Sequence, residues 1–135
     1  MSDWNAGIIE EFRGNSGVVG GMFEGIPLLL LHHVGAKTGT ERVSPLAYQA
    51  VNDGFAIFAS KAGADSNPDW HHNLLANPET KVEAGTETVA VSARMLSDEE
   101  RQPIWDKQKV AHGQFAEYEA KTDRVIPVFL LEKQS

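Results

Sequence analysis

Residues 27–42 read Pro27-Leu-Leu-Leu-Leu-His-His-Val-Gly-Ala-Lys-Thr-Gly-Thr-Glu-Arg42, and the fold that we expect is built around this stretch. Its first half, Leu28–Val34, is a short continuous apolar run, which is typical of a strand buried on both faces. Its second half, Gly35–Arg42, is a glycine-flanked turn, and residues 43–51 after it indicate a returning strand. The stretch therefore predicts a β-hairpin with a polar turn at its tip.

The turn of this hairpin carries two cations, Lys37 and Arg42, and a hydroxyl group at Thr38. Glycine lets the backbone approach a ligand closely, and lysine and arginine bind the oxygens of phosphates and carboxylates. Two interpretations stay open on these residues alone, a cradle for an anionic group and a solvated polar turn. A P-loop is excluded, because Ala36 stands where that motif requires glycine.

Length and composition limit the class of protein to which the chain can belong. A chain of 135 residues predicts one domain over residues 1–135, and 41% hydrophobic with 23% charged residues is typical of a globular protein. The absence of cysteine excludes disulfides and thiolate catalysis, and a net charge of −7 argues against nucleic-acid binding. Residues 1–5 do not resemble a signal peptide, so we expect a cytoplasmic protein, either a monomer or a homodimer.

The other elements follow from hydrophobic periodicity and turn signals. Pro45 marks an edge or a bulge in the returning strand, and Asn52-Asp53-Gly54 predicts a hairpin turn. Ser97 and Glu100 form the pattern of a capping box. The further elements that we predict are strands at Phe55–Ser60, Thr80–Ala84, Thr86–Met95 and Arg124–Leu131, and helices from about residue 68 to Ala76, from Ser97 to near Gly113, and over Gln114–Lys121. This order favours a mostly antiparallel barrel or sheet with added helices.

An amphipathic helix is predicted at Trp4–Asn15, because Trp4, Ile8, Ile9 and Phe12 share one face. Packing of this face on the core is the favoured interpretation. The alternatives are a cap over a site and peripheral contact with a membrane, although the acidic pair Glu10-Glu11 disfavours binding to anionic lipid.

The chain offers no recognisable catalytic motif of its own. There is no serine-nucleophile elbow, and the pairs His32-His33 and His71-His72 lack the spacing of metal ligands, so we expect no metal site. Any chemistry is therefore expected from a bound cofactor. Candidate contacts are Ser60-Lys61 at a strand end and the run Asp69-Trp70-His71-His72-Asn73 on a short helix, with a core position as the favoured interpretation of Trp70.

Taken together and in order, these motifs resemble the deazaflavin-dependent nitroreductase and quinone reductase family of actinobacteria. The segments that carry the resemblance are Trp4-Asn5, Ile8–Arg13, Gly20-Gly21, Pro27–His32, Gly35–Leu46, Ala59–Gly63, Asn67–Leu74, Ala76–Pro78 and Arg124–Val128. The resemblance implies an α+β fold, a split β-barrel of about six mostly antiparallel strands with peripheral helices, related to the FMN-binding split barrels. It also implies the anionic cofactor coenzyme F420.

The resemblance further implies an oxidoreductase that transfers a hydride from reduced F420 to a hydrophobic acceptor such as a quinone, an enone or a nitro compound. The alternatives are an FMN- or haem-linked protein on the same barrel and a non-catalytic deazaflavin carrier. Tyr48 and Tyr118 are candidate proton donors. Ala36 stands where the family usually has arginine, so one cation is missing. The implied cofactor-binding residues are Lys37, Thr38, Gly39, Arg42, Val43, Ser44, Pro45, Leu46, Ser60, Lys61, Asp69, Trp70 and Asn73.

Overall fold

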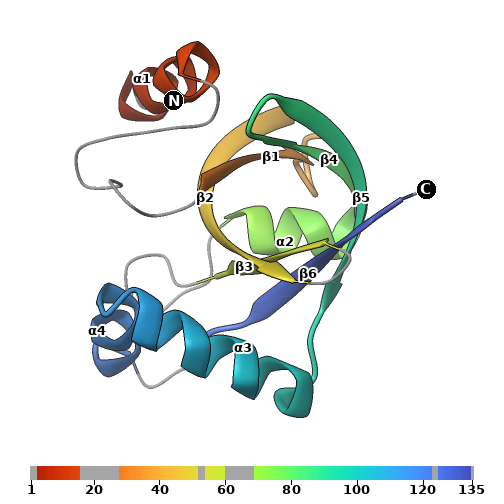
Figure 1. Cartoon of the computed structure of the whole chain (residues 1–135). Helices are drawn as coiled ribbons and strands as arrows, with labels where there is room; N and C mark the ends of the chain where they lie inside the picture. Colours follow the sequence, from red (N-terminus) through yellow and green to blue (C-terminus); the bar gives the residue numbers. More distant parts are fainter. Residues whose placement is uncertain (1–2, 16–27, 52–53, 60–68, 123–124, 135) are drawn as a thin grey trace.

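The computed structural model describes residues 3–15, 28–51, 54–59, 69–122 and 125–134. Six strands form a closed antiparallel barrel in the order β1-β2-β3-β6-β5-β4, as Figure 1 shows in a view along the barrel. This confirms the predicted antiparallel barrel. The strands are β1 (Leu28–Val34), β2 (Glu41–Val51), β3 (Gly54–Phe58), β4 (Glu79–Ala84), β5 (Glu87–Met95) and β6 (Val128–Lys133), and the helices are α1 (Asp3–Gly14), α2 (Asp69–Ala76), α3 (Asp98–Ala111) and α4 (Gln114–Ala120).

The leucine run of β1 is buried on both faces, as predicted. Leu29 and Leu31 point into the barrel, whereas Leu28 and Leu30 pack outside it against α1. The alternation predicted for β5 is also confirmed, because Val91 and Ala93 belong to the interior cluster. Within the same barrel, the continuous apolar run thus marks a strand that is covered on both faces, and the alternating run marks a strand whose apolar side chains face the interior.

The bounds of β3 and β6 differ from the prediction by more than one residue. β3 ends at Phe58, and the predicted strand end at Ser60 lies outside the described residues. β6 begins at Val128 rather than Arg124 and runs on to Lys133. Pro127 explains the later start, because proline has no N–H group for the ladder, although its carbonyl accepts a hydrogen bond of 2.9 Å from the Ala59 N–H.

β2 continues through Pro45 without a break. Pro45 pairs with Leu30 of β1, whereas the pairing of β2 with β3 covers only Tyr48–Val51. Within the described residues, Pro45 is therefore paired on one side only, which gives it the edge position that its missing N–H requires.

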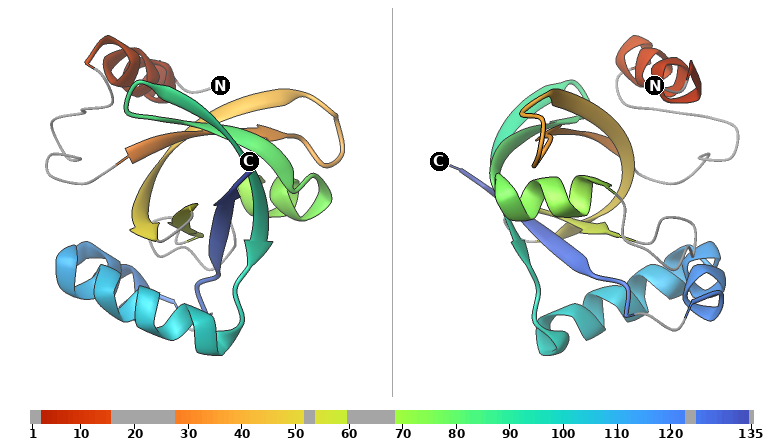
Figure 2. Two further views of the ribbon diagram at one scale, coloured as in Figure 1. Left: turned by 45° about the vertical axis from the view of Figure 1, so that its right-hand side comes forward. Right: turned by 180° about the vertical axis from the view of Figure 1, so that it is seen from behind.

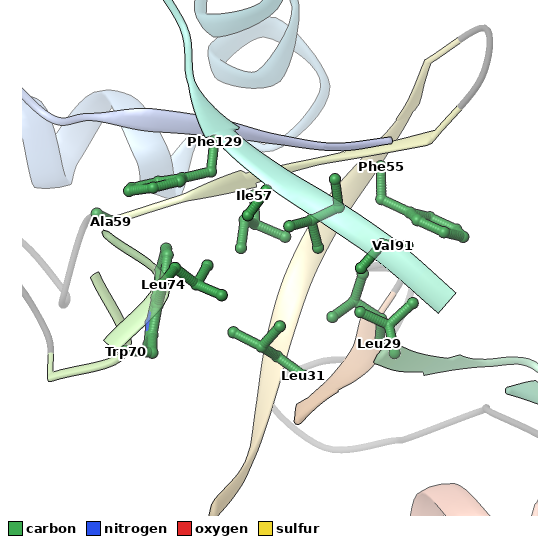
Figure 3. Packing of buried hydrophobic residues seen from close by; sticks show 12 residues of the cluster. Leu29, Leu31, Phe55, Ile57, Ala59, Trp70, Leu74, Val91 and Phe129 are labelled. Carbon is green, nitrogen blue, oxygen red and sulfur yellow. The ribbon is translucent and has the colours of Figure 1, made fainter. Parts of the chain in front are cut away.

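The short helix α2 closes one end of the barrel (Figure 1). Its Trp70 and Leu74 point inward among the residues of the barrel interior (Figure 3). The rings of Trp70 and Phe129 pack edge to face with their centroids 5.7 Å apart. This anchoring fixes which residues of α2 remain on the outside of the barrel end.

Two helical layers cover the outside of the barrel on opposite sides (Figure 2). The predicted capping box of α3 is present, because the Ser97 side chain accepts from the Glu100 N–H and the Glu100 side chain accepts from the Ser97 N–H. Trp105 of α3 is fully buried. It belongs to a second cluster outside the barrel, together with Ala56, Phe58, Leu96, Phe115, Ile126 and Val128.

Helix α1 covers the other side, and its apolar face packs on the barrel as predicted. Phe12 is 1% exposed and lies with Ile8 against Leu28 and Leu30. This packing uses the face that a membrane contact would need. No helix among the described residues is long and apolar enough to cross a membrane.

The end of α1 is held to the barrel by the ion pair between Arg13 and Glu83. Arg13 donates two hydrogen bonds to the Glu83 carboxylate, from Nε at 3.0 Å and from Nη2 at 2.6 Å. His32 Nε2 lies 2.8 Å from Glu83 Oε2 on the other side. These contacts lower the pKa of Glu83 from its ordinary 4.5 to about 2, chiefly through the hydrogen bond from Arg13.

Glu83→Gln is therefore expected to lower the free energy of unfolding by about 1–2 kcal/mol at neutral pH. The lowered pKa of Glu83 alone corresponds to a larger free energy, but the Arg13 side chain is 52% exposed and water screens the ion pair. Because the pKa of Glu83 is lower in the folded protein, its stabilisation is complete above about pH 4.5 and is lost as the pH falls toward 2. Urea unfolding across this range checks the difference between the two proteins.

Glu79→Gln is the matched control, because Glu79 is an exposed residue of the same strand with no ion pair among the described residues. A difference between wild type and Glu83→Gln that stays constant down to pH 2 would show that the carboxylate is not paired in solution.

Candidate functional site

The turn between β1 and β2 is held in shape by its own backbone. The Gly35 N–H donates to the Thr40 carbonyl and the Gly39 N–H to the Gly35 carbonyl, both at 2.9 Å. Gly39 has a φ of 69°, a conformation that favours glycine, and a Cβ added at Gly35 would lie 2.5 Å from Thr38 Oγ1. The two glycines therefore allow the tight course of the turn.

This turn and helix α2 form the two sides of a cavity of about 460 Å³. Lys37 and Arg42 are exposed at the cavity and form no ion pair within the described part of the chain. The residues that line it are Gly35, Ala36, Lys37, Thr38, Arg42, His72 and Asn73, and none of these is acidic. A cavity with unpaired cations and no carboxylate among its described lining is suited to an anion.

The backbone of the turn adds further donors. The Ala36 N–H is used within the protein, whereas the N–H groups of Lys37 and Thr38 have no acceptor among the described residues. Backbone N–H groups and cationic side chains together form charge-assisted hydrogen bonds with phosphate and carboxylate oxygens. The observed geometry therefore favours the anion cradle over the solvated turn.

Asn73 joins the two sides of the cavity. Its Oδ1 accepts a hydrogen bond of 2.9 Å from the Ala36 N–H, which fixes the orientation of the side-chain amide. Its Nδ2 then donates to His33 Nδ1 at 2.8 Å. Because both Asn73 and His33 are buried, these bonds hold the turn and α2 at a fixed separation.

The same chain of hydrogen bonds assigns the tautomer of His33. Since Nδ1 accepts from Asn73, the proton of a neutral ring lies on Nε2, which is 2.9 Å from Ser44 Oγ. His33 therefore donates to Ser44. Ser44 and Arg42 occupy alternate positions of β2 and so share one face of the strand.

The other predicted site residues lie in several surroundings. Leu46 packs against the barrel interior and Val43 against the α1 cluster. Trp70 is a core residue, and it does not line the cavity. Ser60, Lys61 and the side chain of Asp69 lie outside the described residues.

The two candidate proton donors lie apart from the cavity lining. Tyr48 packs edge to face on Phe55 at 5.3 Å, on the face of β2 that Arg42 also occupies. Tyr118 of α4 packs on Phe115 at 5.4 Å in the cluster outside the barrel.

His72 was predicted only as part of the candidate run Asp69–Asn73 and of the His71-His72 pair, and its own place at the cavity was not predicted. The structure separates the two histidine side chains, because His71 is buried beside Phe129 while His72 is exposed. The described residues contain no group of three or more potential metal ligands. The spacing of Trp70 and Leu74 could have revealed the position of His72, since an inward-facing i, i+4 pair leaves the residue midway between them on the opposite face.

Comparison with known proteins identifies the family of the chain. Residues 7–133 match the family model of F420H(2)-dependent quinone reductases. An F420H(2)-dependent quinone reductase of Mycobacterium tuberculosis is 34% identical over 127 residues, which cover 91% of this chain and 85% of the relative. The solved structure of an F420-H2 dependent reductase, FDR-A, is 40% identical with a TM-score of 0.72 and covers 78% of this chain and 94% of its own.

A further solved structure, described as a domain-swapped dimer, is 36% identical with a TM-score of 0.73. It covers 96% of this chain and 98% of its own. The family model covers most of the chain, and the barrel agrees with that of the related reductase. This chain belongs to the family of F420H(2)-dependent quinone reductases, and it is an F420H(2)-dependent oxidoreductase whose cofactor is coenzyme F420.

Proposed function

We propose that this chain transfers a hydride from reduced F420 to a hydrophobic acceptor, with quinones as the first class and enones and nitro compounds as further candidates. The observation that carries the proposal is the cavity between the β1–β2 turn and α2, with its unpaired cations Lys37 and Arg42. F420 is strongly anionic through its phosphodiester and polyglutamate tail, so the charge of the ligand fits the charge of the cavity.

In this proposal, Lys37, Thr38 and Arg42 hold the phosphate and the tail. The side chains of Lys37 and Arg42 supply charge, and the backbone N–H groups of Lys37 and Thr38 supply directed donors. Asn73 supports this arrangement from α2. The remaining proposed cofactor contacts are Gly39, Val43, Ser44, Pro45, Leu46, Ser60, Lys61, Asp69 and Trp70.

Bound reduced F420 supplies the hydride, and the protein supplies orientation and a polar setting. A proton donor is needed when the acceptor is a quinone or an enone. We prefer Tyr48 to Tyr118 as the proton donor, because Tyr48 lies on the strand that also contributes Arg42 to the cavity. Tyr118 lies in the cluster outside the barrel.

Titration of the purified protein with F420 and with FMN tests the choice of cofactor. We expect saturable binding of F420 and weak or no binding of FMN. Tight binding of FMN without binding of F420 would overturn the proposal and favour the FMN-linked alternative.

Turnover of reduced F420 with a panel of quinones, enones and nitro compounds tests the choice of acceptor. We expect oxidation of reduced F420 with at least one quinone. Binding of F420 without oxidation by any acceptor would instead favour the non-catalytic carrier.

For assembly, we propose a homodimer in preference to a monomer, with the related domain-swapped dimer as support. Light scattering of the purified protein measures the mass directly, and a mass of one chain at micromolar concentration would overturn this proposal. The cytoplasmic location remains a prediction.

A further inference from the structure

His72 is a titratable residue of the cavity to which the sequence analysis gave no role of its own. It lies on α2, is exposed, and lines the cavity together with Lys37 and Arg42 of the opposite side. Its ring packs edge to face on His71, with centroids 5.0 Å apart and an interplanar angle of 84°. Trp70 and Leu74 are anchored in the barrel, so α2 is held with His72 at the cavity.

The charges around His72 determine how it responds to a ligand. Lys37 and Arg42 are the charged groups in the cavity lining, and no carboxylate accompanies them among its described residues. The buried ring of His71 lies beside His72 on the same helix, and Asp69 lies one turn earlier in the sequence of α2. An anion in the cavity favours a proton on an imidazole beside it.

Imidazole is the side chain whose charge changes most readily near neutral pH. An anion held by Lys37 and Arg42 is therefore placed to draw a proton onto His72.

We propose that His72 is a further anion-binding residue of the cofactor site and that its protonation is linked to the binding of F420. This inference rests on the proposed function, because it takes F420 as the ligand of the cavity. It assigns His72 to the phosphodiester and carboxylate groups of the ligand rather than to the deazaflavin ring. F420 should therefore bind more tightly as the pH falls through the neutral range, and binding should take up protons.

Calorimetric titration with F420 in two buffers of different ionisation enthalpy measures this proton uptake. For wild type we expect net uptake near neutral pH and an affinity about three- to tenfold higher at about pH 6 than at about pH 8, as a partly exposed charge-assisted contact would produce. His72→Gln should lose most of the uptake and most of the pH dependence. His72→Lys should keep tight binding at both pH values, because its charge is fixed.

Two controls isolate the effect. His112→Gln should retain the pH dependence of wild type, because His112 follows α3 and lies outside the cavity lining, and thermal unfolding should show that each variant is folded. If His72→Gln takes up protons as wild type does, His72 is not the linked group, whereas the proposed function survives because F420 still binds. If wild type itself fails to bind F420, the proposed function fails and this inference fails with it.

Discussion

Asn73→Leu is expected to lower the free energy of unfolding by about 2–4 kcal/mol. The variant removes the acceptor of the exposed Ala36 N–H and the donor to the buried His33 Nδ1. A lost hydrogen bond costs about 0.5–1.5 kcal/mol, and a buried polar group left without a partner costs about 1–3 kcal/mol. Leucine has the same branching and number of side-chain heavy atoms as asparagine, so the change removes the hydrogen bonds without opening a cavity. Urea unfolding at constant pH measures the effect.

The same variant is expected to weaken F420 binding, although both polar ends of the Asn73 amide are already used within the protein. Without the bond from Ala36 to Asn73, the β1–β2 turn loses its hydrogen bond to α2, and Lys37 is no longer held opposite His72. Asn73 therefore acts as a positioning residue for the cavity. Calorimetry with F420, under conditions in which the variant is folded, separates this loss from the loss of stability.

Asn73→Asp provides a conservative comparison. A carboxylate still accepts from the Ala36 N–H, but it cannot donate to His33, so Nδ1 of the ring must carry a proton to donate to the introduced carboxylate. A ring that is protonated on both nitrogens makes this contact an ion pair and still donates to Ser44. The charged His33 gains a carboxylate partner in the folded state only. The stability of this variant should therefore be partly recovered at about pH 6 and fall as the pH rises to about 8.

Asn77→Ala is the matched control for position 73. Asn77 follows α2 and is exposed, and within the described residues its side chain donates only a long hydrogen bond of 3.4 Å to the Val34 carbonyl. Asn77→Ala should lower the free energy of unfolding by well under half of the amount that Asn73→Leu does. If Asn73→Leu unfolds at the same urea concentration as wild type, the network contributes nothing to stability and its role in positioning the turn is wrong.

The local elements were predictable because the pattern of apolar residues in each segment indicates which of its faces are buried. The leucine run of β1 indicates a strand that is buried on both faces, and the alternation around Val91 indicates a strand with one face in the barrel interior. Closure of the barrel was not predictable in the same way. It depends on pairings between distant segments, such as β1 with β4 and β3 with β6, and no local pattern encodes which strand lies beside which.

The site residues also fall into those that local sequence predicted and those that depend on tertiary contacts. The cations of the turn were predictable from their residue types and the flanking glycines. His72 required knowledge of which face of α2 enters the barrel, and the support of the turn by Asn73 and His33 required the tertiary contact between α2 and β1. The role of Trp70 shows the reverse case, because its core position follows from its apolar ring and its helical partner Leu74.

Lys37→Ala and Arg42→Ala are each expected to weaken F420 binding by about 10- to 150-fold. This range corresponds to about 1.5–3 kcal/mol for the loss of one charge-assisted hydrogen bond. Both side chains are exposed and form no ion pair within the described residues, so neither variant should lower the free energy of unfolding by more than about 0.5 kcal/mol. Calorimetric titration with F420 and urea unfolding measure the two quantities separately.

The double variant decides between the two interpretations of the turn. If both cations hold the same anion, the losses combine to well over 100-fold, and binding to wild type weakens with added salt because screening acts on both contacts. Lys107→Ala is the control, since Lys107 is an exposed residue of α3 outside the cavity lining. A double variant that binds F420 within threefold of wild type would leave Lys37 and Arg42 as solvated charges, and the anionic part of the cofactor would have to lie elsewhere on the barrel.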